Sequence, residues 1–96
     1  MINMAVRGDL GNFIARATCG LPWSEALAGL DPAGFPMLAG LLPYGDAVFN
    51  ERQIPVLLKE LKRLPPELGG AWVEEVRRLC SIALQAPHRY VWFLGD

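Results

Sequence analysis

Apolar residues recur at helical spacing in two stretches of the second half of the chain. The first stretch carries Ile54, Leu57, Leu58, Leu61 and Leu64, and the second carries Trp72, Val73, Val76, Leu79, Cys80, Ala83 and Leu84. Such spacing puts the apolar side chains on one face of an α-helix. The pattern therefore predicts two helices, 50–64 and 71–85, which the turn-forming residues 65–70 join into an antiparallel hairpin.

The start of the first helix carries its own signal. Asn50 is a favourable N-cap residue, and Gln53 three positions later completes a capping-box pattern. Pro55 lacks a backbone N–H and removes an early helical hydrogen bond, so we expect a short first turn and a second start near Ile54. The polar residues expected on the solvent-facing side of this helix are Lys59, Glu60, Lys62 and Arg63.

Three further stretches are typical of strands. Residues 2–7 alternate, with Ile2, Met4 and Val6 on one side, and residues 88–94 are aromatic and β-branched. Residues 35–42 are almost wholly apolar and lie between Gly34 and Pro43, which is typical of a strand buried on both faces. We predict a strand over each of these ranges.

Residues 10–19 fit two structures. Leu10, Phe13, Ile14 and Ala17 stand at helical spacing, which predicts a helix. Residues 12–18 equally fit the second arm of a β-hairpin that turns between Gly8 and Gly11. We favour the hairpin, because a strand at 2–7 needs a neighbour. Residues 22–30 predict a short helix with Ser24 as its N-cap.

These elements predict a fold of the α+β class in a single compact domain, 1–96. The expected sheet is small and antiparallel, with strands near 2–7, 12–18, 35–42 and 88–94. The helical hairpin of 50–64 and 71–85 is expected to cover the sheet with its leucine-rich faces.

Composition narrows the class of partner. Of the 96 residues, 52% are hydrophobic, and the net charge is −1. This apolar content argues against disorder and for a protein partner or self-association, whereas the charge predicts no binding of nucleic acid or of a membrane surface. The N-terminus lacks the pattern of a secretory signal, and prolines interrupt the longest uncharged stretch. We therefore expect a cytoplasmic protein.

The residues needed for catalysis are sparse. The aliphatic hydroxyls are Thr18, Ser24 and Ser81, and His88 is the single histidine. None lies in a recognisable nucleophile motif, so we predict no catalytic residues and no enzyme. Cys19 and Cys80 do not form a C-x-x-C pair, and we expect two unpaired core thiols, no metal site and no cofactor.

The last strand offers a candidate interaction surface. In His88-Arg-Tyr-Val-Trp-Phe-Leu94, alternation puts Tyr90 and Trp92 on one face and Val91 and Phe93 on the other. If helices cover only one face of the sheet, the other face exposes aromatic side chains. Exposed tyrosine and tryptophan are typical of protein–protein hot spots.

Two segments resemble a family of small uncharacterised bacterial proteins. The first is Asp46-Ala-Val-Phe-Asn50-x-x-Gln53, preceded by Phe35-Pro-Met-Leu38, and the second is His88-x-Tyr-x-x-Phe-x-Gly-Asp96. The resemblance covers about the last two-thirds of the chain and leaves the N-terminal third unmatched. It implies a compact bacterial, cytoplasmic domain and carries no established activity.

The motif residues Asp46, Asn50, Gln53 and His88 are polar groups amid apolar sequence. If they are buried they must be hydrogen-bonded, and they would then join the helix start to the last strand. The predicted binding residues are Tyr44, Asp46, Asn50, Gln53, His88, Tyr90 and Trp92. The function we expect is a non-catalytic interaction or regulatory domain that blocks a protein partner, as an immunity protein does. The alternative is a small-ligand or metal-binding domain that uses the four motif residues.

Overall fold

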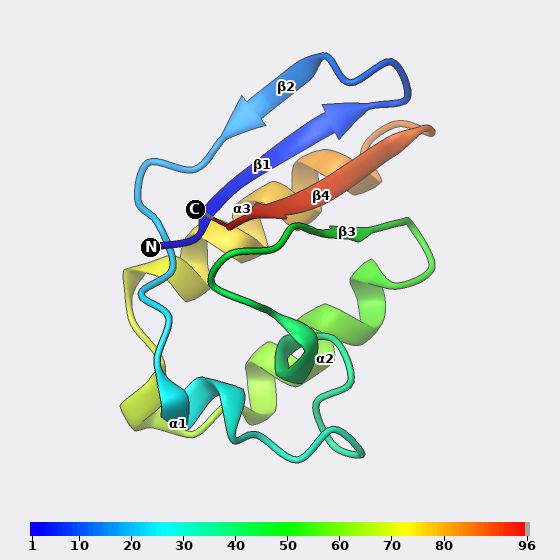
Figure 1. The fold of residues 1–96 in the computed structure, drawn as a ribbon. Helices are drawn as coiled ribbons and strands as arrows, with labels where there is room; N and C mark the ends of the chain where they lie inside the picture. The colour runs from blue at the N-terminus through cyan, green and yellow to red at the C-terminus, as the bar shows by residue number, and fades with distance from the viewer. Residues whose placement is uncertain (96) are drawn as a thin grey trace.

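The first and last strands of the chain lie side by side at the centre of a four-stranded antiparallel sheet (Figure 1). The computed structural model describes residues 1–95. In chain order the elements are β1 (Asn3–Gly8), β2 (Phe13–Arg16), α1 (Glu25–Ala28), η1 (Leu38–Gly40), β3 (Ala47–Phe49), α2 (Ile54–Arg63), η2 (Pro66–Leu68), α3 (Ala71–Leu84) and β4 (Arg89–Leu94). The strand order is β2-β1-β4-β3, and the predicted α+β class is confirmed.

The N-terminal hairpin is present, so the helical alternative for residues 10–19 is wrong. The Gly8 N–H donates to the Asn12 carbonyl at 2.9 Å, and the Gly11 N–H donates to the Gly8 carbonyl at 3.0 Å. Gly11 has a φ of 82°, a conformation that residues with a Cβ rarely adopt. This glycine therefore permits the tight turn that pairs β2 with β1.

Helix α3 covers one face of the sheet and contacts β1, β4 and β2 (Figure 1). Its buried residues are Trp72, Val76, Leu79, Cys80 and Ala83, and they share one core with Val6, Val91 and Phe93. Helix α2 packs against α3, and its buried Ile54, Leu57 and Leu61 extend the same core. The predicted helical hairpin is therefore present, and α3 makes the more extensive contacts with the strands.

The predicted first turn of helix 50–64 is a separate capping turn, and α2 itself begins at Ile54. The Asn50 side chain accepts from the N–H groups of Arg52 and Gln53 at 2.9 and 3.1 Å. The Gln53 side chain accepts from the Asn50 N–H at 2.9 Å, which completes the capping box. The predicted helix at 22–30 is shorter, because α1 runs from Glu25 to Ala28 behind its N-cap Ser24.

The predicted strand at 35–42 is wrong. These residues form turns and the short 3₁₀ helix η1, and the remaining strand is β3 at Ala47–Phe49. The reason lies in α2: the Glu60 carboxylate accepts from the N–H groups of Met37 at 3.1 and 3.2 Å and of Leu38 at 3.0 Å. Pro36 has no N–H to offer a neighbouring strand. The apolar run therefore bonds to a helix side chain instead of a sheet.

Glu60 was also expected on the solvent-facing side of its helix, and that prediction is wrong. Its exposed fraction is 0%, and the carboxylate lies under the 35–38 loop. On the next turn, the Arg63 guanidinium donates to the Gly34 carbonyl and lies over the Phe35 ring at 5.4 Å. Two polar residues of α2 thus hold the loop against the core.

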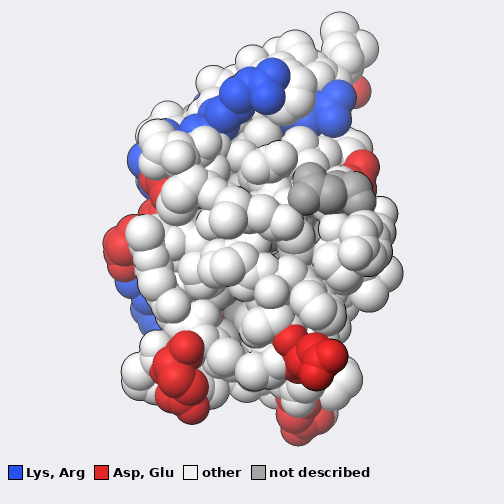
Figure 2. All heavy atoms as spheres, turned by 60° about the vertical axis from the view of Figure 1, so that its left-hand side comes forward, with Lys and Arg blue, Asp and Glu red and all other residues white. Residues whose placement is uncertain are grey.

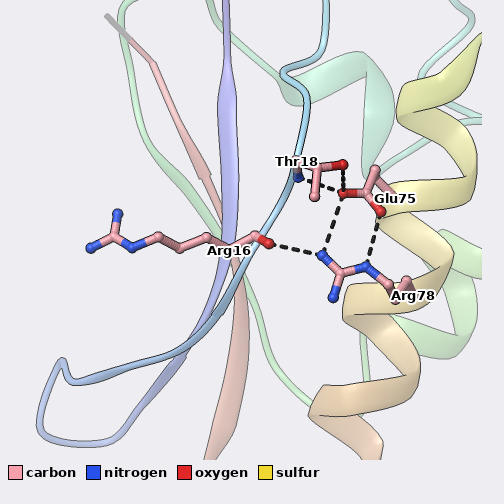
Figure 3. Close-up of polar contacts among 4 residues, drawn as sticks. All are labelled: Arg16, Thr18, Glu75 and Arg78. Carbon is pink, nitrogen blue, oxygen red and sulfur yellow. Dashed lines mark hydrogen bonds and ion pairs between the residues drawn. The ribbon is translucent and has the colours of Figure 1, made fainter.

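Helix α3 covers the C-terminal end of the outer edge of β2 (Figure 3). Ala17 donates its N–H to Met4 of β1, so the backbone groups of its neighbours Arg16 and Thr18 point the other way. The Glu75 carboxylate accepts from the Thr18 N–H and, at 2.6 Å, from the Thr18 hydroxyl. Arg78 pairs with Glu75 at 2.9 Å and donates to the Arg16 carbonyl at 2.8 Å. These bonds occupy groups that another strand would need.

Removing the Glu60 carboxylate is expected to destabilise the fold strongly. Glu60→Ala leaves the buried N–H groups of Met37 and Leu38 without an acceptor, which costs about 3 kcal/mol or more of unfolding free energy. Glu60→Gln, which keeps the volume and one acceptor oxygen, is expected to cost less. Urea denaturation measures both. The control is Lys59→Ala on the exposed side of α2, where a loss as large as that of Glu60→Ala would contradict the role assigned to Glu60.

The Glu75 contacts predict a specific loss of stability in acid. Hydrogen bonds from Arg78 and from Thr18 lower the pKa of Glu75 from 4.5 to about 2. Since the folded pKa is below the unfolded one, these bonds stabilise the fold fully above pH 4.5 and lose their effect as the pH falls towards 2.

Glu75→Gln should therefore lose less stability than the wild type between pH 4.5 and 2, as measured by thermal melts across that range. The matched control is Glu74→Gln, because Glu74 pairs with Arg77 on the exposed surface of the same helix. An acid profile of Glu75→Gln that parallels the wild-type profile would refute the prediction.

Candidate interaction surface on the open face of the sheet

Within the described residues 1–95, one face of the sheet has no helix over it, since the helices lie below and behind the strands in Figure 1. Val91 and Phe93 of β4 point into the core with exposed fractions of 0%, so their neighbours Tyr90 and Trp92 point to the other face. The strand register pairs Trp92 with Ala5 and Val48. We name this surface the open face; its residues are Asn3, Ala5, Arg7, Phe13, Arg16, Val48, Tyr90, Trp92 and Leu94.

Arginines and aromatic rings stack along the open face. The Arg7 guanidinium carbon lies 4.5 Å from the Trp92 ring centroid and 4.9 Å from that of Phe13. The Arg16 guanidinium carbon lies 3.5 Å from the Phe13 centroid. Figure 3 shows the Arg16 side chain extending away from α3, while its carbonyl faces Arg78. A guanidinium over an aromatic ring is an attractive cation–π contact, so these side chains order one another.

The stack has a hollow at each end. A hollow of about 250 Å³ lies beside Trp92 and is lined by Gly8, Asp9, Gly11, Val48, Tyr90 and Trp92. A second hollow of about 300 Å³ lies beside Arg16 and is lined by Asn3, Met4, Ala5, Arg16, Ala17, Cys19 and Leu94. The open face therefore offers depressions that side chains of a partner can fill.

Charge is unevenly spread over the side of the molecule seen in Figure 2. Basic side chains gather at the top, at the height of β2 in Figure 1, and acidic side chains gather at the bottom, at the height of α1. The centre of this view is uncharged, and further charged side chains lie along its left edge. Within residues 1–95, neither Arg7 nor Arg16 forms an ion pair with a carboxylate.

Asp9 joins two of the predicted binding residues at the rim of the open face. The Tyr90 hydroxyl donates to Asp9 Oδ1 at 2.7 Å, and His88 Nδ1 lies 3.1 Å from Asp9 Oδ2. This hydrogen bond and the negative charge of Asp9 raise the pKa of Tyr90. His88 has a φ of 60°, which is uncommon for a residue with a Cβ. Beside it, a hollow of about 150 Å³ is lined by Asn50, Glu51, Arg52, His88, Arg89 and Tyr90.

The structure separates Asp46 from the other three polar motif residues. Asn50 and His88 line the same hollow at the end of β3 where α2 begins. Gln53 is occupied by the capping box, and Asp46 precedes β3, where its carboxylate accepts from the Gly95 N–H at 3.1 Å. Within residues 1–95, the bond from these residues to the end of β4 is that of Asp46, and it lies at the end of β3 away from the helix start, so it is not the expected link. Tyr44 is 84% exposed.

Sequence reasoning missed Asp9, Arg7, Phe13 and Arg16. Asp9 and Arg7 come from the first hairpin, whose structure was ambiguous, and they reach Tyr90 and Trp92 only through β1–β4 pairing. A usable signal was present, because Arg7 alternates with the apolar Met4 and Val6 and therefore faces away from the core.

The described residues were compared with the requirements of a metal site and of a reactive thiol. Within residues 1–95 no group of three or more histidine, cysteine or acidic side chains lies close enough to hold a metal ion. Cys19 and Cys80 are unpaired, and burial raises the pKa of Cys80 to about 12. In the same range, no helix is long and apolar enough to cross a membrane.

Comparison with known proteins does not identify the chain. No protein-family model, no curated protein and no solved structure matches it. The resemblance to a bacterial family therefore stays a prediction, and the open face is the feature of the molecule that bears on function.

Removal of the Asp9 carboxylate is expected to lower the pKa of Tyr90. Asp9→Ala takes away both the hydrogen bond and the largest nearby negative charge, whereas Glu51→Gln removes a weaker electrostatic contribution and should lower the pKa less. The ultraviolet absorbance of tyrosinate, measured in a Tyr44→Phe background, reports Tyr90 alone, because the chain has two tyrosines. An unchanged titration in Asp9→Ala would show that the Tyr90–Asp9 bond does not form in solution.

Proposed function

We propose that this protein is a non-catalytic interaction domain that binds and blocks a protein partner through the open face. The observation that carries the proposal is the Phe13–Arg7–Trp92 stack on a sheet face without a helix over it. Tryptophan, tyrosine and arginine are the residues most enriched in protein–protein hot spots. We also propose, from the sequence alone, that the setting is bacterial and cytoplasmic.

The shape of the surface supports a protein as the occupant. Phe13 is 42% exposed and Val48 is 40% exposed, so apolar area remains accessible at both sides of the stack. The hollows beside Trp92 and Arg16 are depressions into which side chains of a partner could insert. A mixture of aromatic, aliphatic and guanidinium groups is typical of the centre of a protein interface.

The candidate nucleophiles support a role without catalysis. The Thr18 hydroxyl is bound to Glu75, and the Cys80 thiol is buried with a raised pKa. His88 faces Asp9 on the exposed rim. These contacts use the reactive groups to hold the fold together, and a thiol with a raised pKa is a poor nucleophile at neutral pH.

A second candidate function is small-ligand binding in the hollow beside His88. Asn50 and His88, both predicted binding residues, line this hollow together with Arg52 and Arg89. Its volume of about 150 Å³ admits only a small molecule. The two candidate functions use different surfaces, so variants of the open face separate them.

The open-face variants Phe13→Ala and Trp92→Thr are expected to abolish partner capture. Hot-spot truncation costs about 2 kcal/mol or more, which lowers the affinity by a factor of about thirty or more. Threonine at position 92 is β-branched and therefore suits a strand. The measurement is quantitative capture from a lysate of the source organism by the tagged full chain, followed by titration with the purified partner.

The matched control is Leu84→Ala, which truncates an apolar side chain that is 47% exposed at the end of α3. It should capture the partner as the wild type does. The proposal fails if open-face variants and control capture equally, or if sedimentation of the wild-type chain in the lysate shows only a free monomer.

A further inference from the structure

Building on the proposed function, we infer that the partner presents an acidic, extended segment whose carboxylates pair with Arg7 and Arg16. Three observations support this inference: aromatic stacking orders the two guanidiniums, neither has a carboxylate partner within residues 1–95, and both lie over the same Phe13 ring. It goes beyond a general interaction surface, because it states the chemistry and the backbone conformation of the segment that binds.

Both guanidiniums are held in place before any partner arrives. The Arg7 and Arg16 guanidinium carbons lie 4.9 and 3.5 Å from the centroid of the same Phe13 ring. Arg7 Nε also donates to the Gly11 carbonyl at 3.0 Å, which fixes its side chain along the sheet. A planar guanidinium that is already ordered loses less entropy when it forms a bidentate bond to a carboxylate.

Within residues 1–95, neither guanidinium has a carboxylate partner, whereas Arg77 pairs with Glu74 and Arg78 pairs with Glu75. Within residues 1–95, the recorded contact of the Arg16 guanidinium is its stacking on Phe13. Donors that are ordered but lack an anionic acceptor match a carboxylate from outside.

The position of the two groups suits an extended segment. Both lie close together, because their guanidinium carbons are 4.9 and 3.5 Å from one ring centroid, and alternate side chains on one face of an extended chain stand roughly 7 Å apart. Carboxylates at positions i and i+2 of the partner segment can therefore reach Arg7 and Arg16 together. The intervening side chain points away from the sheet.

The same geometry disfavours single-stranded nucleic acid, which also binds aromatic and basic sheet surfaces. Base stacking needs an open aromatic ring, whereas guanidiniums already lie over Phe13 and Trp92. An acidic protein segment is the occupant that the surface favours.

The experiment titrates the full chain, labelled with ¹⁵N, with three probes: a decapeptide of alternating glutamate and valine, the same peptide with lysine for glutamate, and a short oligothymidylate. The acidic peptide is expected to shift the resonances of Phe13, Arg16 and the Trp92 indole, and rising salt should weaken its binding. Arg16→Gln should weaken binding about tenfold, the loss expected for one charge-assisted bond. Lys62→Gln removes a positive charge from the exposed side of α2 and should leave binding unchanged.

Arg16→Gln is expected to leave the contact between β2 and α3 intact, because Arg16 contacts α3 through its backbone carbonyl, which glutamine retains. Unchanged thermal melting confirms that the fold is intact. The inference is overturned if the acidic peptide does not bind, if the lysine peptide binds as well, if oligothymidylate binds more tightly, or if Arg16→Gln binds like the wild type.

The outcome separates this inference from the function on which it depends. A captured partner that needs Phe13 and Trp92 but tolerates Arg16→Gln and high salt leaves the proposed function standing and refutes the acidic segment. Capture that tolerates Phe13→Ala and Trp92→Thr refutes the proposed function itself, whatever Arg16→Gln does.

Discussion

The pairing of β1 with β4 is the interaction on which the rest of the structure depends. It joins the two ends of the chain along six residue pairs, from Asn3 with Leu94 to Gly8 with Arg89. Since side chains alternate along a strand, this one register sends Val6 and Val91 to α3 and brings Arg7 to the face that carries Trp92. A shift by one residue would exchange the core and the open face.

How far the sequence predicts this fold depends on whether a segment's periodicity or a distant contact decides its structure. Helix α3 and strands β1 and β4 follow their own apolar patterns, and the Asn50–Gln53 capping box forms as its residue types indicate. The strand prediction for residues 35–42 is wrong because it rests on the apolar pattern alone. Glu60, more than twenty positions away, accepts hydrogen bonds from the N–H groups of this segment. Local pattern carries no information about such an acceptor, and a glutamate on a helix is normally exposed.

The residues of the candidate site also divide into those that local periodicity predicts and those that a distant contact places. Tyr90 and Trp92 were predictable, because alternation in the last strand separates them from Val91 and Phe93. Their partners Asp9, Arg7 and Phe13 were not, because they come from a hairpin with two possible structures and meet β4 only across the sheet. The prediction that the polar motif residues lie together was wrong for Asp46 for a related reason. Asp46 and Asn50 are close in sequence, but β3 runs between them and places them at its opposite ends.

The rings of the open face would be more exposed if no arginine lay over them. A two-layer fold buries one face of its sheet and leaves the other uncovered, where a bare row of Phe13, Trp92 and Val48 would favour aggregation. The stacked guanidiniums reduce this exposure, because their flat surfaces cover the rings. In the proposed complex, a partner's carboxylate would bind the guanidinium without moving it off the ring. The stacking that covers the rings in the free protein would then also hold the arginines that recognise the partner.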